Sequence, residues 1–163
     1  MSLANGSRWL LMVVLAGLPM FAQDSVTRVY AERNRVHIVY ASGRDVVVDG
    51  QPRQAGADSI QTAAGRTAGW LALYDNPDGG SPVAETLVLW RAKVIQRFQT
   101  EQTFWSWSFY AGDEQVAYHV GPTHGESSSH CELHEVNSGR KLASWDGDLD
   151  DPKRPPWTKS LDH

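Results

Sequence analysis

Four histidines lie close together in the C-terminal third of the chain, and imidazole is a common ligand of Zn²⁺ and Cu²⁺ in proteins: His119, His124, His130 and His134. The order His130-Cys131-Glu132-Leu133-His134 differs from the His-Glu-x-x-His helix of zinc peptidases. In a strand, residues four apart are separated by about 13 Å, so the last two histidines cannot share one ion there. A metal site, and any metal-dependent hydrolysis, therefore requires the loop at residues 121–125 to bring His119 or His124 towards His130. The alternative is that these are ordinary loop and surface histidines.

Carboxylates form a second group of potential ligands: Asp146, Asp148, Asp150 and Asp151. A calcium-binding loop of the helix-loop-helix type needs glycine at its sixth position and glutamate at its twelfth. This chain has Asp151 and Trp157 at those positions. We therefore expect a solvated acidic turn, with a Ca²⁺ site as the alternative.

Nucleophilic catalysis has little support in the sequence. The Gly-x-Ser-x-Gly motif of a nucleophile elbow does not occur. Gly79-Gly80 lacks the lysine and the spacing of a phosphate-binding loop. Nothing around Cys131 marks it as an activated thiol rather than a small strand residue. The sequence therefore predicts a non-enzymatic protein with no cofactor.

Tryptophan is the residue type that most often anchors a binding surface or fills a core, and six tryptophans follow residue 22: Trp70, Trp90, Trp105, Trp107, Trp145 and Trp157. Alternation places Trp105, Trp107 and Phe109 on one face of a strand, which we expect to be core. The Pro-Pro-Trp sequence at residues 155–157 indicates an exposed tail, so Trp157 is the predicted contact for a protein partner.

The first 22 residues have the layout of a cleavable secretory signal. Arg8 supplies a positive charge, residues 9–18 form an apolar run, and Ala22 offers a small residue for cleavage. The run is too short for a membrane span, which needs about 20 apolar residues. A buried N-terminal helix or strand is the alternative interpretation. With Cys131 as the single cysteine, the sequence predicts export to a bacterial-type envelope, in the periplasm or outside the cell.

In the rest of the chain, short apolar runs alternate with turn residues, which predicts an antiparallel all-β protein. We expect one domain at residues 23–151 and a Pro-rich tail at residues 152–163. We expect strands at residues 35–40, 45–49, 67–74, 104–110, 115–120, 131–136 and 141–145, and a polar loop at residues 50–58. Residues 85–98 fit a helix by the spacing of Leu87, Trp90, Val94 and Phe98, and fit a hairpin equally well.

A weak repeat runs through the second half of the chain. Gly65 and Gly112 each precede an apolar strand, and residues 108–118 and 135–142 resemble the strand-turn-strand hairpins of TolB-like and WD-like propeller blades. The resemblance covers roughly residues 58–145 and implies a local order of strands rather than an activity. A closed propeller needs about four to eight blades, and this chain has room for two. The sequence therefore predicts an open or sandwich-like meander, with self-association through its open sheet edges.

Charge and composition narrow the partners further. The 163 residues carry a formal charge of −4 and contain no basic run, which argues against nucleic acid as a partner. No later apolar stretch approaches the length of a membrane span. We therefore expect an exported binding module with a protein partner. Metal binding or metal-dependent hydrolysis at His119, His124 and His130 is the alternative.

Overall fold

The computed structural model describes residues 24–77, 79–122 and 129–162. In these segments the chain is all-β and every strand pairing is antiparallel. The strands are β1 (Val26–Glu32), β2 (Arg35–Tyr40), β3 (Asp45–Asp49), β4 (Gln54–Ala63), β5 (Thr67–Tyr74), β6 (Val83–Arg91), β7 (Val94–Gln99), β8 (Thr103–Tyr110), β9 (Gln115–Gly121), β10 (Ser129–Glu135) and β11 (Lys141–Gly147), followed by the 3₁₀ helix η1 (Pro156–Leu161).

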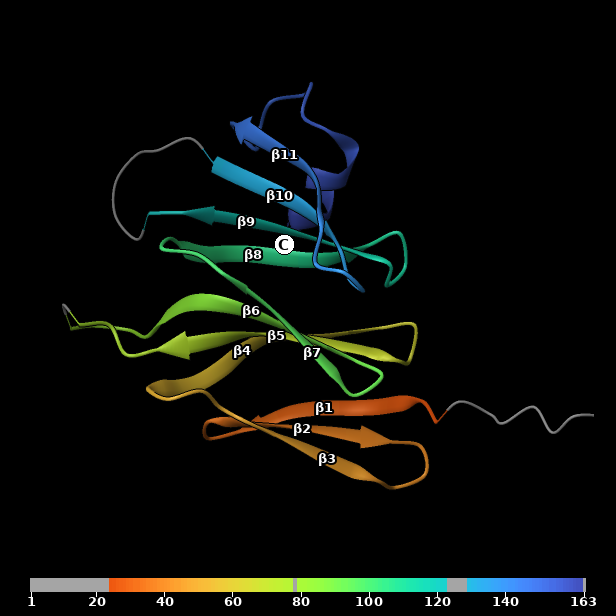
Figure 1. The fold of residues 1–163 in the computed structure, drawn as a ribbon. Helices are drawn as coiled ribbons and strands as arrows, with labels where there is room; N and C mark the ends of the chain where they lie inside the picture. Colours follow the sequence, from red (N-terminus) through yellow and green to blue (C-terminus); the bar gives the residue numbers. More distant parts are fainter. Residues whose placement is uncertain (1–23, 78, 123–128, 163) are drawn as a thin grey trace, which may run out of the picture.

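The strands form three meandering sheets that stack on one another in the order of the chain (Figure 1). The N-terminal sheet has the order β1-β2-β3, the middle sheet β4-β5-β6-β7, and the C-terminal sheet β11-β10-β9-β8. The described strands form neither a closed barrel nor a closed propeller. The predicted all-β antiparallel class is confirmed, while the resemblance to propeller repeats stays a prediction.

The middle sheet is buried on both faces. Alternate residues of β5, such as Trp70 and Tyr74, pack on Val36 and Ile38 of the N-terminal sheet. The residues between them, such as Leu71, pack against the C-terminal sheet. A strand buried on both faces has no need of polar residues, which explains why residues 67–74 are almost continuously apolar.

Residues 85–98 form a hairpin. Strands β6 and β7 pair from Thr86↔Gln99 to Arg91↔Val94, with Ala92 and Lys93 as the two turn residues. Both have positive φ, 50° and 70°, as a two-residue turn of this twist requires. Leu87 and Phe98 are cross-strand partners rather than neighbours on a helix. The structure therefore decides between the two alternatives that the sequence left open.

The loop predicted for residues 50–58 is wrong in its second half, because β4 begins at Gln54. This strand has few large apolar residues, and it is held by pairing with β5 and by contact with β1 and β8. Strand β1 was not anticipated either. Both are edge strands, where burial imposes little pattern on the sequence.

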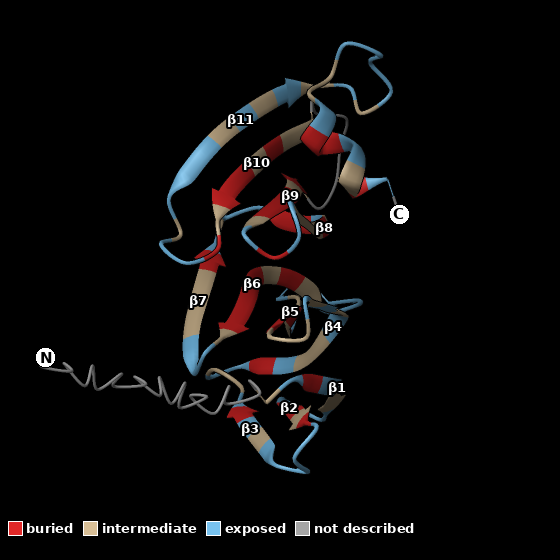
Figure 2. Ribbon diagram, turned by 90° about the vertical axis from the view of Figure 1, so that its right-hand side faces the viewer, coloured by how far each residue is buried: buried red, intermediate tan, exposed pale blue. Residues whose placement is uncertain are grey.

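The two outer faces of the stack are closed in different ways. On the C-terminal sheet, η1 lays Trp157 and Leu161 over Ala117, Cys131 and Leu133. The outer face of the N-terminal sheet is polar instead: Arg35 pairs with Asp49 at 3.0 Å, and the His37 ring stacks on Tyr30. Figure 2 shows that β11, the outer edge strand, is exposed along much of its length. Self-association through such edges stays a prediction.

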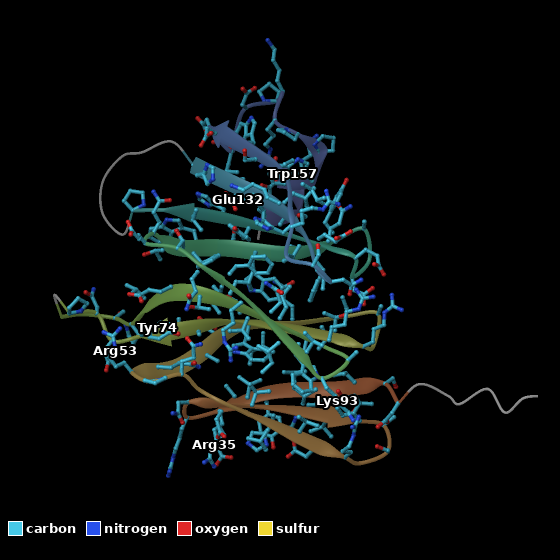
Figure 3. The ribbon with its side chains drawn as sticks, in the orientation of Figure 1. Arg35, Arg53, Tyr74, Lys93, Glu132 and Trp157 are labelled. Atoms are coloured by element: carbon cyan, nitrogen blue, oxygen red, sulfur yellow. The ribbon has the colours of Figure 1, made fainter. Side chains whose placement is uncertain are left out.

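The exposure predicted for Trp157 is wrong, since only 8% of this residue is accessible. Its side chain, on η1, packs against Ala117, Cys131 and Leu133 of the C-terminal sheet, in the region labelled in Figure 3. Proline at the start of a 3₁₀ helix fixes its geometry here, rather than extending the tail into solvent. The partner contact predicted at Trp157 depended on that exposure.

A buried carboxylate ties the middle sheet to the C-terminal sheet. Asp113, in the β8–β9 turn, has 2% of its side chain exposed and accepts two hydrogen bonds of 2.7 Å from Arg66. Thr67 donates a third at 2.7 Å, and Arg91 donates to the backbone carbonyl of Asp113 at 3.0 Å. The Arg66 hydrogen bond is the main cause that lowers the pKa of Asp113 to about 2, against the opposing effect of burial.

Replacing Asp113 by Asn is expected to lower the free energy of unfolding by about 1–3 kcal/mol at neutral pH, because Arg66 loses its charged acceptor. The folded pKa is depressed, so this contribution is present above the unfolded pKa and is lost as the pH falls towards 2. Urea unfolding of both proteins checks this. The control is Asp49→Asn in an exposed pair, which should cost less than about 1 kcal/mol. A gap between wild type and Asp113→Asn that stays the same near pH 2 would contradict the account.

Trp157→Ala is expected to destabilise the protein by about 3–5 kcal/mol, because it removes the largest fully packed side chain between η1 and the sheet, 8% accessible. Thermal unfolding followed by circular dichroism measures the loss. Lys159→Ala, on the exposed side of the same helix, is the matched control and should leave the melting temperature nearly unchanged. Equal melting temperatures for Trp157→Ala and wild type would show that the helix does not cover the sheet in solution.

Candidate functional site

The strand register separates the histidines that the sequence placed together. His130 and His134 lie on the same face of β10 as Glu132, opposite Val120 and Val116 of β9. His119 pairs with Cys131, one position out of phase, and so lies on the other face of the sheet. Burial lowers the pKa of His119. His124 lies outside the described residues.

A metal site is therefore not assembled from His119 and His130. Within the described parts of the chain, no group of three or more His, Cys, Asp or Glu side chains is placed to hold a metal ion. Burial also raises the pKa of the Cys131 thiol to about 11, so it stays protonated rather than acting as a thiolate ligand.

What the structure builds around these residues is a hydrogen-bond network centred on Glu132. Tyr118 donates to its Oε2 at 2.5 Å, and His134 Nε2 contacts the same oxygen at 2.7 Å. His130 Nε2 lies 3.1 Å from Oε1, which also pairs with the Lys141 ammonium. Figure 3 shows Glu132 within the C-terminal sheet. Strands β9, β10 and β11 all contribute, so the network fastens the outer half of this sheet.

The charges around Glu132 favour its ionised form. Burial alone would raise the pKa of this carboxyl, but the hydrogen bonds from Lys141, Tyr118 and the two histidines outweigh burial and hold the pKa well below its usual range. Burial, reinforced by Glu132, raises the pKa of Tyr118, so its hydroxyl stays protonated and donates. A carboxylate has about four acceptor positions, and all four are occupied. Glu132 is therefore placed to hold strands together rather than to accept a substrate proton.

Asp146 extends the network to the surface. Its Oδ1 lies 2.6 Å from His130 Nδ1, and this hydrogen bond is the main cause that raises the pKa of His130. Glu132 raises it further from the other ring nitrogen. An imidazole between two carboxylates is suited to carry a positive charge, which fits a structural link better than a general base.

The stability that His130 supplies is expected to be present below its unfolded pKa, near 6.5, and to be lost as the pH rises through its higher folded pKa. An NMR titration of the histidine rings measures this folded pKa directly. Asp146→Asn should lower it, because the main cause of the shift is removed. An unchanged His130 pKa in that variant would show that the two side chains do not pair in solution.

The largest exposed apolar side chain among the described residues is Trp105, which the sequence placed in the core. Strand β8 has a bulge between Phe104 and Ser106, where the register with β9 shifts. As a result Phe104 and Trp107 share the core face, and Trp105 points outward with 51% of its surface accessible. The prediction for Trp105 is wrong because one extra residue in a strand reverses the faces that follow. The prediction that Trp107 is core is confirmed.

Trp105 stands beside a groove of about 420 Å³ between the middle and C-terminal sheets. Apolar side chains contribute to its lining, among them Leu71, Leu73 and Phe104. Polar side chains line it as well: Asp58, Ser59, Asn76 and Ser81. Asp58 is the one ionisable group among the described lining residues. A hollow of this size with mixed walls matches the usual description of a small-ligand site.

A second bulge lies across the groove. Strand β4 slips its register between Asp58 and Gln61, and Ser59 adopts a positive φ of 47°. The indole of Trp107 donates to the Ser59 carbonyl at 3.0 Å, and the Gln61 amide donates to the Trp107 carbonyl at 2.7 Å. These two hydrogen bonds fix the irregular strands β4 and β8 to each other, so the groove is already formed in the absence of a ligand.

Glycine makes room for both indoles. A Cβ at Gly121 would lie 3.0 Å from Trp105 Nε1, so the Trp105 ring rests against the β9 backbone. A Cβ at Gly69 would lie 2.5 Å from Trp107 Cη2, so the Trp107 ring occupies the space above β5 that a side chain would fill. Both rings therefore depend on bare backbone beneath them.

Another hollow of about 420 Å³ lies at the end of β5 and β7, beside Tyr74 and Arg53 (Figure 3). Its aromatic group is already engaged: the Tyr74 hydroxyl donates to Gln51 at 2.9 Å, and the residue is 8% accessible. Trp105 is the only exposed aromatic side chain in the parts of the chain that the structure describes. The groove at Trp105 is therefore the stronger candidate site.

Sequence reasoning missed this groove because no motif marks it. The available signal was the alternation of Trp105 and Trp107, which pointed inward. No protein-family model matches the chain. No curated protein and no solved structure matches it either. The geometry of the site therefore carries the functional argument alone.

Proposed function

We propose that this chain is an exported, non-enzymatic binding protein whose ligand lies in the groove beside Trp105. The observation that carries the proposal is the exposed indole, turned out of the core by a bulge and supported on Gly121. Exposing an aromatic ring of this size is unfavourable in water, so it is most simply retained for contact with a ligand.

The groove supports binding rather than catalysis. Acid-base and nucleophilic catalysis both need at least one activated group, with a partner to exchange its proton. The described lining residues include Asp58 and several hydroxyl groups, but no histidine, cysteine or lysine to activate them. His130 and His134 of the C-terminal sheet are engaged by Glu132, Asp146 and backbone instead.

The proposal that the protein is exported rests on the sequence of residues 1–22, which lie outside the described part of the chain. The described residues include no helix that is long and apolar enough to cross a membrane. Export would be supported by finding a shortened chain in the envelope fraction and by sequencing its N-terminus, which should lie near residue 23.

The binding proposal is tested on the mature protein labelled with ¹⁵N, by following the Trp105 indole N–H signal while neutral sugars, short neutral peptides and small amines are added separately. At least one class is expected to shift this signal and to saturate. Trp105→Phe assigns the resonance. Trp105→Ala lacks this signal, so its affinity is measured by isothermal titration calorimetry. It should bind the same compound at least tenfold more weakly, since it loses the principal apolar contact.

Val94→Ala is the matched control, because Val94 is 62% exposed in a different part of the middle sheet. Its affinity should equal that of the wild type. Thermal unfolding of Trp105→Ala should stay close to wild type, because the ring is half in solvent. If none of the three classes perturbs Trp105, the groove is not a ligand site and the proposed function is wrong.

A further inference from the structure

We propose that the ligand of the Trp105 groove is a neutral saccharide, an inference that rests on the proposed function of this groove. The first argument is charge. Asp58 contributes a carboxylate, and none of the described lining residues is a lysine, an arginine or a histidine. A phosphorylated or carboxylated ligand would meet a like charge with no cation to offset it. The groove therefore selects against anions.

The second argument is the shape of the contact surface. Trp105 is the one exposed aromatic ring among the described lining residues, which also include Leu73 and the buried Phe104. A pyranose ring presents C–H groups on one face and hydroxyls around its edge. Its C–H face can cover an indole, because the face of an aromatic ring is electron-rich and attracts positively polarised hydrogens.

The third argument is the polar rim. Asp58 Oδ1 accepts the backbone N–H of Ser59 at 2.6 Å, which orients the carboxylate. Asp58 is exposed, and none of the hydrogen bonds found among the described residues reaches its Oδ2. A carboxylate oxygen accepts hydroxyl hydrogens through short, charge-assisted bonds. Ser59 and Ser81 add hydroxyls that both donate and accept, as the alternating groups of a sugar edge require.

A peptide is the competing occupant, and the structure favours it less. Extended peptides are most often bound by adding a strand to an open sheet edge. This groove lies between two sheets whose facing strands, β4 and β8, are already pinned through Trp107 to Ser59 and Gln61. Its volume of about 420 Å³ also fits a small ligand better than a long chain.

The experiment compares a neutral sugar with its acidic counterpart on the mature protein. Glucose, galactose, mannose and N-acetylglucosamine, with their short oligomers, are titrated while the Trp105 indole N–H signal is followed. The best neutral sugar is then compared with the uronic acid of the same ring. The neutral sugar should bind at least about tenfold more tightly, because Asp58 repels the acid.

Two variants separate the contributions. Asp58→Asn should weaken the neutral sugar about tenfold and should remove the discrimination against the uronic acid. Both Trp105 variants lack the indole signal, so their affinities are measured by isothermal titration calorimetry. Trp105→Ala should bind the neutral sugar at least tenfold more weakly, and Trp105→Phe should retain part of the affinity. Val94→Ala, away from the groove, should bind as wild type does.

The outcomes are distinct. Shifts caused only by peptides or amines would overturn the saccharide inference and leave the binding function standing. A uronic acid that binds as tightly as the neutral sugar would also overturn the inference. If no compound of any class shifts Trp105, both the inference and the proposed function are wrong.

Discussion

Burial of the middle sheet on both of its faces is the constraint on which the rest of the structure depends. A sheet in this position needs an apolar partner on each side, and the two neighbouring sheets supply Val36, Ile38 and the Trp107 layer. Stacking in this way leaves two outer sheet faces, and each must be covered or made compatible with water. A helix with Trp157 covers one, and ion pairs with a stacked Tyr30–His37 pair make the other compatible with water.

Polar contacts then fix how the stacked sheets lie against each other. Hydrophobic packing alone permits sliding, because it has little directionality. Asp113 with Arg66 joins the sheets at one end, and Trp107 with Ser59 joins them towards the groove. The Glu132 network holds the outer strands of the C-terminal sheet in register. The groove beside Trp105 is consequently bounded by strands that cannot shift independently.

The sequence was sufficient where burial imposes a period of two, as in residues 35–40 and 67–74. Prediction from the sequence failed in β8, where one extra residue interrupts the alternation. Nothing in the sequence before Trp105 indicates this bulge. The sequence drew attention to His130 and His134 as ligands, but Tyr118, which contacts His134, and Lys141, which pairs with Glu132, are brought close only by the register of neighbouring strands. Trp157 was misassigned because prolines before it resemble a flexible tail until a sheet face is available to receive the helix.

The close approach of the Trp107 ring to Gly69 has a consequence for how this protein can change over generations. Any larger residue at Gly69 displaces an indole that also holds Ser59, so a substitution deep in the middle layer would reshape the groove beside Trp105 without touching it. Rim residues such as Asp58 and Ser81 can be exchanged without disturbing this packing. Substitutions should therefore accumulate at the rim of the groove before they reach the layer beneath it.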